Sequence, residues 1–261
     1  MNVPFAELLT DAVNKPGILS DCYKRFYNYS FGNQMWIWSQ LVSQDKPLQP
    51  VNTFDRWLKM GRCVSKGSKA TLSVLIPMTI GKKEPEDKGF TMFKLRNCLF
   101  TVDQTTVIDA EKDIETAEIT AQWGKALALE TLNISEAPFA SLNGNSQGYA
   151  FERSIAVNPC AVLPHKTTFH EIAHVVLGHT KTERMDDSEE LRRDIQEVEA
   201  ECVAYILCSV LNLQGLEESR GYIQNWLREG SVQDATAKRI FSAATKILKA
   251  GQYQTKGMES V

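Results

Sequence analysis

The sequence predicts an α+β protein: a small α+β first part, followed by a mainly helical second part that contains a small sheet. Three observations support this class. Helical patterns fill the first 44 residues, β-rich runs follow between residues 70 and 102, and helical patterns return after residue 160. With 261 residues, of which 43% are hydrophobic, the chain is long enough to bury a sizeable core.

The first part begins with helices over residues 4–14 and 20–44, with an interruption expected around Gly32. A short helix follows in TFDRWLKMG, where Thr53 is the expected N-cap and a glycine ends the helix. A charged turn within residues 81–89 then separates β-rich runs that are expected to form a small sheet. These runs are ATLSVLIP, FTMFKL and CLFTV.

A charged segment, DAEKDIETAEITA, lacks a strong apolar face at its start and marks a boundary near residue 110. We therefore predict two domains, residues 1–110 and 111–261. In the second domain a helix extends to about Leu132, and SIAVNP forms a short strand. The histidine-rich segment comes next, and further helices are expected over residues 187–213, 217–228 and 232–249.

Charge is divided unevenly between the two parts. Up to residue 110 the chain has 14 Lys and Arg against 10 Asp and Glu, and beyond it 15 against 22, so different binding partners are expected. The six cysteines form no CxxC pair, which favours reduced thiols over a disulfide framework or a thiolate zinc site. Because the chain has neither a secretory signal nor a run of about 18 apolar residues, we expect a cytoplasmic protein without a membrane partner.

The most specific motif lies in TTFHEIAHVVLGH, which holds three of the chain's four histidines. His170 and His174 are four residues apart, so on a helix they share one face, offset by about 40° and one turn. Two imidazoles can then bind one metal ion, and Glu171 can take a proton from a water on that ion, as in metallopeptidases. One Zn²⁺ per chain is expected, although other divalent transition metals suit these ligands.

The third ligand is expected from the next long helix. His179 lies about 140° round the helix from His174 and follows a glycine, which is typical of a favourable charge at a helix C-terminus, so it is left out of the ligand set. Glu197 and Glu201 enter a buried stretch on one face, spaced i,i+4. We assign Glu197 as the third ligand and Glu201 as an acceptor that orients one histidine. The alternative is that both glutamates are solvated.

The first part also combines basic and aromatic residues. Between Lys24 and Lys83, ten basic side chains outnumber two acidic ones, and aromatic residues alternate with them. Positive grooves lined with aromatic rings hold single-stranded nucleic acid without reading its sequence. The alternative is a solvated lysine-rich face with its tryptophans in the core. The predicted DNA contacts are Lys24, Arg25, Trp36, Arg56, Lys59, Arg62, Lys66 and Lys69.

Over nearly its whole length the chain resembles the ArdC family of antirestriction proteins. The resemblance implies an N-terminal domain that binds single-stranded DNA and a C-terminal zincin domain similar to ImmA/IrrE peptidases. It also implies a glutamate ligand from the helix after HExxH, and the match falls on Glu197, with Ala200 and Glu201 following. The stretches that carry the resemblance are YSFGNQMWIWSQ, TFDRWLKMGRCVSKGSKATLSVLIP, FKLRNCLFTVDQT, HEIAH and QEVEAECVAYIL.

This family is associated with plasmids and other mobile elements, and with protection of incoming single-stranded DNA from restriction during conjugation. The resemblance therefore implies a single-stranded-DNA-binding antirestriction protein with a zinc metallopeptidase domain, and a host protein is its expected substrate. The alternative is a non-proteolytic protein that coats single-stranded DNA and whose metal site is structural or a docking surface. A third hypothesis is a peptidase whose basic half binds an acidic protein.

Overall fold

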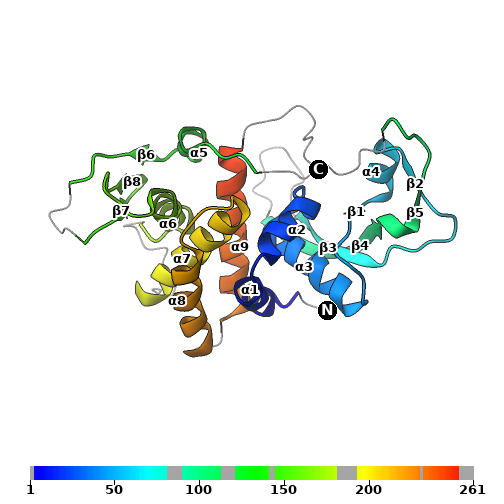
Figure 1. Ribbon diagram of the computed structural model, residues 1–261, viewed down its shortest axis with the longest axis horizontal. Helices are drawn as coiled ribbons and strands as arrows, with labels where there is room; N and C mark the ends of the chain where they lie inside the picture. Colours follow the sequence, from blue (N-terminus) through cyan, green and yellow to red (C-terminus); the bar gives the residue numbers. More distant parts are fainter. Residues whose placement is uncertain are drawn as a thin grey trace. The chain divides into compact units, whose positions relative to one another are not determined.

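The computed structural model of the chain, shown in Figure 1, describes residues 3–80, 90–112, 121–140, 145–180, 193–229 and 232–252. Its residues form two compact units that interleave along the sequence. The helical unit comprises Met1–Tyr23, Ser30–Gly32 and Thr120–Val261, and the sheet unit comprises Lys24–Tyr29 and Asn33–Ile119. The division into domains 1–110 and 111–261 stays a prediction, and these units differ from it by grouping the first 23 residues with the C-terminal helices.

The helical unit is centred on one long buried helix. In α7 every residue from Val198 to Cys208 is buried, and α6, α8 and α9 pack against this helix. Trp123, which precedes α5, is bonded to α9: its Nε1 donates a hydrogen bond to the carbonyl oxygen of Ile247 at 3.0 Å. The helices that belong wholly to this unit are α1 (Phe5–Asn14), α5 (Lys125–Leu132), α6 (Pro164–Leu177), α7 (Arg193–Val210), α8 (Leu216–Glu229) and α9 (Asp234–Gly251).

A small sheet lies beside α6 in the same unit. Its strand order is β6-β8-β7, with β6 (Ser135–Glu136) parallel to β8 (Ser154–Val157) and β7 (Gly148–Phe151) antiparallel to β8. Helix α6 packs against both β7 and β8. The sheet therefore places the edge strand β7 next to the helix that carries the HEIAH motif.

The described residues of the sheet unit form two small antiparallel sheets. The first has the order β1-β4-β3, formed by β1 (Val51–Asn52), β3 (Leu72–Ile80) and β4 (Phe90–Thr101), and the second pairs β2 (Arg62–Val64) with β5 (Thr105–Val107). The short helix α4 (Phe54–Lys59) begins at Thr53, whose side chain accepts a hydrogen bond from the backbone N–H of Arg56, so the predicted cap is confirmed. A 3₁₀ turn, η1 (Val102–Gln104), follows β4.

Two expected boundaries differ from those observed. The runs FTMFKL and CLFTV, apart from Val102, form the single strand β4, because the exposed residues Arg96 and Asn97 between them pair in register with Val74 and Ser73. Successive side chains point to opposite faces, and both residues are exposed, so their polarity does not interrupt the β-ladder.

The interruption expected at Gly32 lies earlier, between α2 (Ile18–Phe26) and α3 (Phe31–Ser43). Gly32 itself is inside α3, where a Cβ atom would lie 2.9 Å from the ring of Phe5, so this glycine serves close packing.

The α+β class is confirmed, since helices and small sheets occur in the described residues of the chain. Helix, in addition, is the dominant element of the second half, as the sequence predicts. None of the helices in the described ranges has the length and apolar character needed to cross a membrane.

Candidate functional site

Helix α6 presents the HEIAH motif to α7. The helix begins with Pro164 in its first turn and ends at Leu177, and it is capped by Gly178, whose φ of 82° is the left-handed conformation typical of a helix C-cap. Phe169 and Ile172 are fully buried, and the centroid of the Phe169 ring lies 4.7 Å from that of the Trp123 ring. Because these apolar side chains occupy the core face, the two histidines of the motif are left to face α7.

The structure brings His170, His174 and Glu197 together. Nε2 of His170 lies 3.1 Å from Nε2 of His174, and Oε2 of Glu197 lies 3.3 Å from the first nitrogen and 3.6 Å from the second. In the part of the chain that the structure describes, these three residues form the group that could hold a metal ion. Their side chains are 20%, 12% and 42% exposed, so an ion could reach them from solvent.

The donor set and its spacing fit a divalent metal ion. Around a tetrahedral ion with bonds of about 2.0–2.2 Å, neighbouring ligand atoms are separated by about 3.3–3.6 Å. The distances among His170, His174 and Glu197, from 3.1 to 3.6 Å, are close to that range. Two imidazole nitrogens and one carboxylate oxygen also leave a fourth position for water or substrate, as in catalytic zinc sites.

Glu201 contacts the other ring nitrogen of His170. Its Oε2 lies 3.1 Å from Nδ1 of His170, and its Oε1 pairs with the ammonium group of Lys166 at 2.7 Å. Burial would raise the pKa of Glu201, but its hydrogen bonds with His170 and Lys166 lower it to about 2. Lys166 is absent from the predicted site, although it stands one turn before His170 on α6 and the i,i+4 spacing could have identified it.

The carboxylates also raise the proton affinity of His170. Burial would lower the pKa of this imidazole, but hydrogen bonds with Glu197 and Glu201 raise it to about 9. Hydrogen bonds with His170 and His174 hold the pKa of Glu197 well below its usual range. In the metal-free chain, a proton on His170 therefore balances the negative charge of Glu197 and Glu201, and a bound metal cation would take the place of that proton.

Metal uptake is expected to depend on pH, with affinity rising as pH rises. The metal-free pKa of His170 is about 9, so below that pH its proton competes with the metal, and apparent affinity should rise about tenfold per pH unit between pH 6 and 8. Calorimetric titration with zinc in buffers of different ionisation enthalpy would measure the protons released. Release of no proton at pH 7 would contradict the expectation.

Glu171, the predicted proton acceptor, is buried beside strand β7. It is 7% exposed, and burial raises its pKa, an effect opposed by the nearby His170 and His174. A Cβ atom on Gly148 of β7 would lie 3.0 Å from Oε1 of Glu171 and 2.7 Å from the side chain of Thr167. The carboxyl group of Glu171 therefore lies directly against the edge strand, at a place that only glycine leaves open.

Substitution Gly148→Ala is expected to destabilise the helical unit by about 1–3 kcal/mol, because the added methyl group overlaps Thr167 and the carbonyl oxygen of Ala156. The matched control is Gly221→Ala in α8, where a Cβ atom meets nothing within 4 Å and a gain of about 0.5–1 kcal/mol is expected from helix propensity. Urea unfolding would measure both free energies. A Gly148→Ala protein as stable as wild type would contradict the close approach of β7 to α6.

His179, which the sequence excludes from the ligand set, lies next to the site. Its Nδ1 is 3.0 Å from Nδ1 of His174, and its Nε2 is 2.9 Å from Oε2 of Glu199. The left-handed turn at Gly178 allows this approach, since the backbone N–H of His179 then bonds the carbonyl oxygen of His174 at 2.9 Å. Glu199 is fully buried and is absent from the predicted site, because no spacing in the sequence relates it to a histidine beyond the end of α6.

The predicted DNA-contact residues all belong to the sheet unit but differ in exposure. Arg25, Lys59, Lys66 and Lys69 are exposed, whereas Lys24, Trp36, Arg56 and Arg62 are half-buried. Two of the half-buried side chains have structural partners. Trp36 donates from Nε1 to the hydroxyl of Ser73 at 3.1 Å. Arg62 donates to the hydroxyl of Thr105 and lies 5.9 Å from the ring of Trp57.

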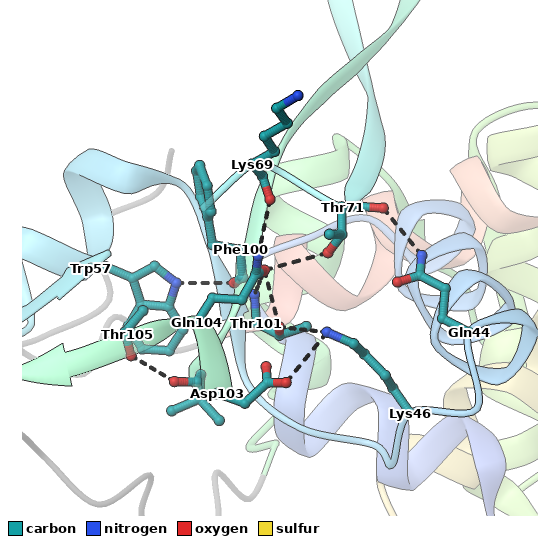
Figure 2. Close-up of polar contacts among 11 residues, drawn as sticks. Gln44, Lys46, Trp57, Lys69, Thr71, Phe100, Thr101, Asp103, Gln104 and Thr105 are labelled. Carbon is teal, nitrogen blue, oxygen red and sulfur yellow. Dashed lines mark hydrogen bonds and ion pairs between the residues drawn. The ribbon is translucent and has the colours of Figure 1, made fainter. Parts of the chain in front are cut away.

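Lys66 and Lys69 lie on a turn that Gln104 holds in place, as Figure 2 shows for its side-chain contacts. The Gln104 side chain donates to the carbonyl oxygen of Lys69 at 2.9 Å and accepts from the backbone N–H of Thr101 at 3.0 Å. Its backbone oxygen accepts from the N–H of Ser65 at 2.9 Å. The turn is closed by a hydrogen bond from the backbone N–H of Ser68 to the carbonyl oxygen of Ser65, and Gly67 has the left-handed conformation within it, with a φ of 88°. The two lysines are therefore displayed on a backbone that is already ordered.

Comparison with known proteins finds a family model that matches the first part of the chain and solved structures with a similar fold. A family model described as the N-terminal domain of anti-restriction factor ArdC matches residues 11–121. No curated protein matches the chain. The fold is similar to crystal structures of the antirestriction ArdC protein from the R388 plasmid, one metal-free (18% identity, TM-score 0.51) and one Mn(II)-bound (17%, TM-score 0.50), each match covering 94% of this chain and 93% of the other. Residues 11–121 therefore match the N-terminal domain of the ArdC family, and over nearly its whole length the chain has a fold similar to that of the antirestriction ArdC protein from the R388 plasmid.

Proposed function

We propose that this chain is an antirestriction protein that binds single-stranded DNA through its sheet unit and has a metal-dependent peptidase site in its helical unit. The observation that carries the proposal is the convergence of His170, His174 and Glu197, with Glu171 adjacent on the same helix. The proposed role is protection of incoming mobile-element DNA, with a host protein as the peptide substrate. Metal analysis of the purified protein is the experiment that tests the central observation.

His170, His174 and Glu197 would hold the metal, and zinc suits their mixed nitrogen and oxygen donors best. The Mn(II)-bound structure of the R388 ArdC protein supports a divalent metal without favouring zinc. When bound, the metal would serve as a Lewis acid toward water and the substrate carbonyl group.

The residues around this group would perform the remaining steps. Glu171, buried and with a raised pKa, would accept the proton of the attacking water on its carboxylate and transfer it to the leaving amine. Glu201 would hold the imidazole of His170 through Nδ1, with its own charge balanced by Lys166. Strand β7 is the edge of its sheet, so an extended peptide could pair with it beside Glu171.

Single-stranded DNA is the proposed partner of the sheet unit. The ordered turn with Lys66 and Lys69 offers two exposed cations, and the exposed Lys59 adds a third on α4. Because the backbone of this turn is already ordered, phosphate binding would cost side-chain freedom of the lysines but little backbone freedom. The contacts of Arg62 with Trp57 and Thr105 give that side chain a structural role as well.

The affinity of the wild-type protein for an oligonucleotide is expected to fall steeply as the salt concentration rises. In the Lys66→Ala, Lys69→Ala double variant, affinity should fall more gradually with salt. Each lysine–phosphate ion pair that the substitutions remove should reduce the slope of log affinity against log salt by about 0.7. Fluorescence anisotropy with a labelled single strand would measure both quantities, with Lys125→Ala of the helical unit as the control. Salt-insensitive binding, or an unchanged slope in the double variant, would contradict this interface.

A second candidate function is a non-proteolytic protein that coats DNA and whose metal site is structural or a docking surface. The partial burial of His170 and His174 between α6 and α7 is compatible with it. This candidate differs in one respect, because it requires the metal for folding or docking and has no use for Glu171.

A further inference from the structure

Two buried residues outside the proposed ligand set form a chain of contacts that ends on His174. The side chains of His179 and Glu199 are 3% and 0% exposed, and Nε2 of His179 lies 2.9 Å from Oε2 of Glu199. The other ring nitrogen of His179, Nδ1, lies 3.0 Å from Nδ1 of His174. The guanidinium group of Arg239 lies 3.5 Å from the same carboxylate oxygen, so a cation faces Glu199 as well.

The order of donors and acceptors along the contacts from Glu199 through His179 to His174 follows from the carboxylate of Glu199. An ionised carboxylate only accepts hydrogen bonds, so Nε2 of His179 has to donate to Glu199. A neutral imidazole then has a lone pair on its other nitrogen, so Nδ1 of His179 accepts and Nδ1 of His174 donates. The remaining nitrogen of His174, Nε2, is left with its lone pair, and this is the atom that lies 3.1 Å from Nε2 of His170.

We propose that Glu199 and His179 are positioning residues, which fix the tautomer of His174 so that its Nε2 is presented to the metal. This inference rests on the metal site of the proposed function. It assigns to His174 the kind of support that Glu201 gives to His170, but through an intervening imidazole. No residue changes its charge in this scheme.

A purely structural role would not account for Glu199. Its Oε1 is buried and has no hydrogen-bond partner among the described residues, and a carboxylate in that position costs stability that an apolar side chain would not. Fixing the tautomer of a ligand gives a reason for keeping a carboxylate there. The left-handed Gly178, which places His179 beside His174, belongs to the same arrangement.

The first test is the tautomer of His174 in metal-free, ¹⁵N-labelled protein, measured by long-range ¹H–¹⁵N correlation spectra. Wild type should have the proton on Nδ1 of His174 and on Nε2 of His179. In Glu199→Gln, the amide can either donate or accept, so His174 should become a mixture of tautomers. A wild-type His174 with its proton on Nε2 would overturn the proposal, whether or not the protein binds metal.

The second test is zinc affinity, measured by competition with a chromophoric chelator. Glu199→Gln should weaken binding about 10- to 100-fold, and His179→Leu should do the same. His179→Gln should stay within a few-fold of wild type, because its amide oxygen can accept from His174 while its nitrogen donates to Glu199. Glu136→Gln, which alters an exposed ion pair of the same unit, should leave affinity unchanged.

The outcomes separate this inference from the metal site on which it rests. Unchanged zinc affinity in Glu199→Gln, or equal losses in His179→Gln and His179→Leu, would overturn the positioning role while wild type still binds zinc. Failure of wild type to bind zinc would refute the metal site itself, and the spectra of the metal-free protein would still decide the tautomer.

Discussion

Replacing Glu197 with alanine is expected to remove most of the bound metal from the protein. Glu197 supplies the only oxygen among the three atoms that converge at the site, and its Oε2 lies within 3.6 Å of both imidazole nitrogens. Loss of a direct ligand should weaken zinc binding by more than the about 10- to 100-fold typical of residues that only hydrogen-bond a ligand. The metal content of protein purified without chelators, compared with wild type at about one zinc per chain, measures the effect.

The control for this experiment is Glu218→Ala, since Glu218 is an exposed glutamate of α8 outside the cluster. The Glu197 side chain is 42% exposed, so its removal should leave the metal-free protein folded. Thermal unfolding in the presence of chelator checks this point. Wild-type metal content in Glu197→Ala would show that this glutamate is not the third ligand, and absence of metal from wild type would remove the basis for the peptidase hypothesis.

The part of the site that could be predicted from the sequence depends on helical periodicity. His170 and His174 share a face because they are four residues apart, and the same spacing relates Glu197 to Glu201 on α7. Burial of the second half of α7 follows from its apolar composition. Since a carboxylate at the edge of a buried stretch requires a partner, these local rules were enough to suggest which side chains would meet between two helices.

Other contacts depend on tertiary geometry that periodicity does not encode. His179 reaches His174 through the left-handed turn at Gly178, and the partner of its other nitrogen comes from the middle of α7. Gly148 is required because β7 passes within contact distance of Thr167 and Glu171, which is visible only once strand and helix are placed together. A glycine in a strand pattern indicates a close approach without naming its partner.

The sheet unit illustrates the same difference for β-structure. The runs that became β3 and β4 were recognisable from their β-branched and aromatic residues. Their continuity through Arg96 and Asn97 was not, because the sequence does not state which face of a hairpin is exposed. Gln104, whose side chain joins Thr101 to Lys69, is similarly unremarkable in sequence, although it anchors the basic turn.

Substitution Glu171→Gln is expected to abolish peptidase activity while leaving the metal bound. Glu171 is not among the three converging ligands, and its amide isostere would occupy the same space beside Gly148. Without a carboxylate to accept the proton of water, hydrolysis should slow by about 10²- to 10⁴-fold. Metal analysis of the variant and turnover of a peptide library by wild type and variant measure the two properties separately. Retained cleavage with metal present would refute the role of Glu171.

The same variant distinguishes peptidase action from DNA coating in a restriction assay. Transfer of an unmodified plasmid into a restricting host would be compared for wild type, Glu171→Gln and the Lys66→Ala, Lys69→Ala variant. If protection requires proteolysis, Glu171→Gln should lose it while still binding oligonucleotides. If protection comes from coating the strand, Glu171→Gln should protect as well as wild type, and the lysine variant should fail. Loss in both variants would mean that protection requires both DNA binding and hydrolysis, because neither would then be sufficient alone.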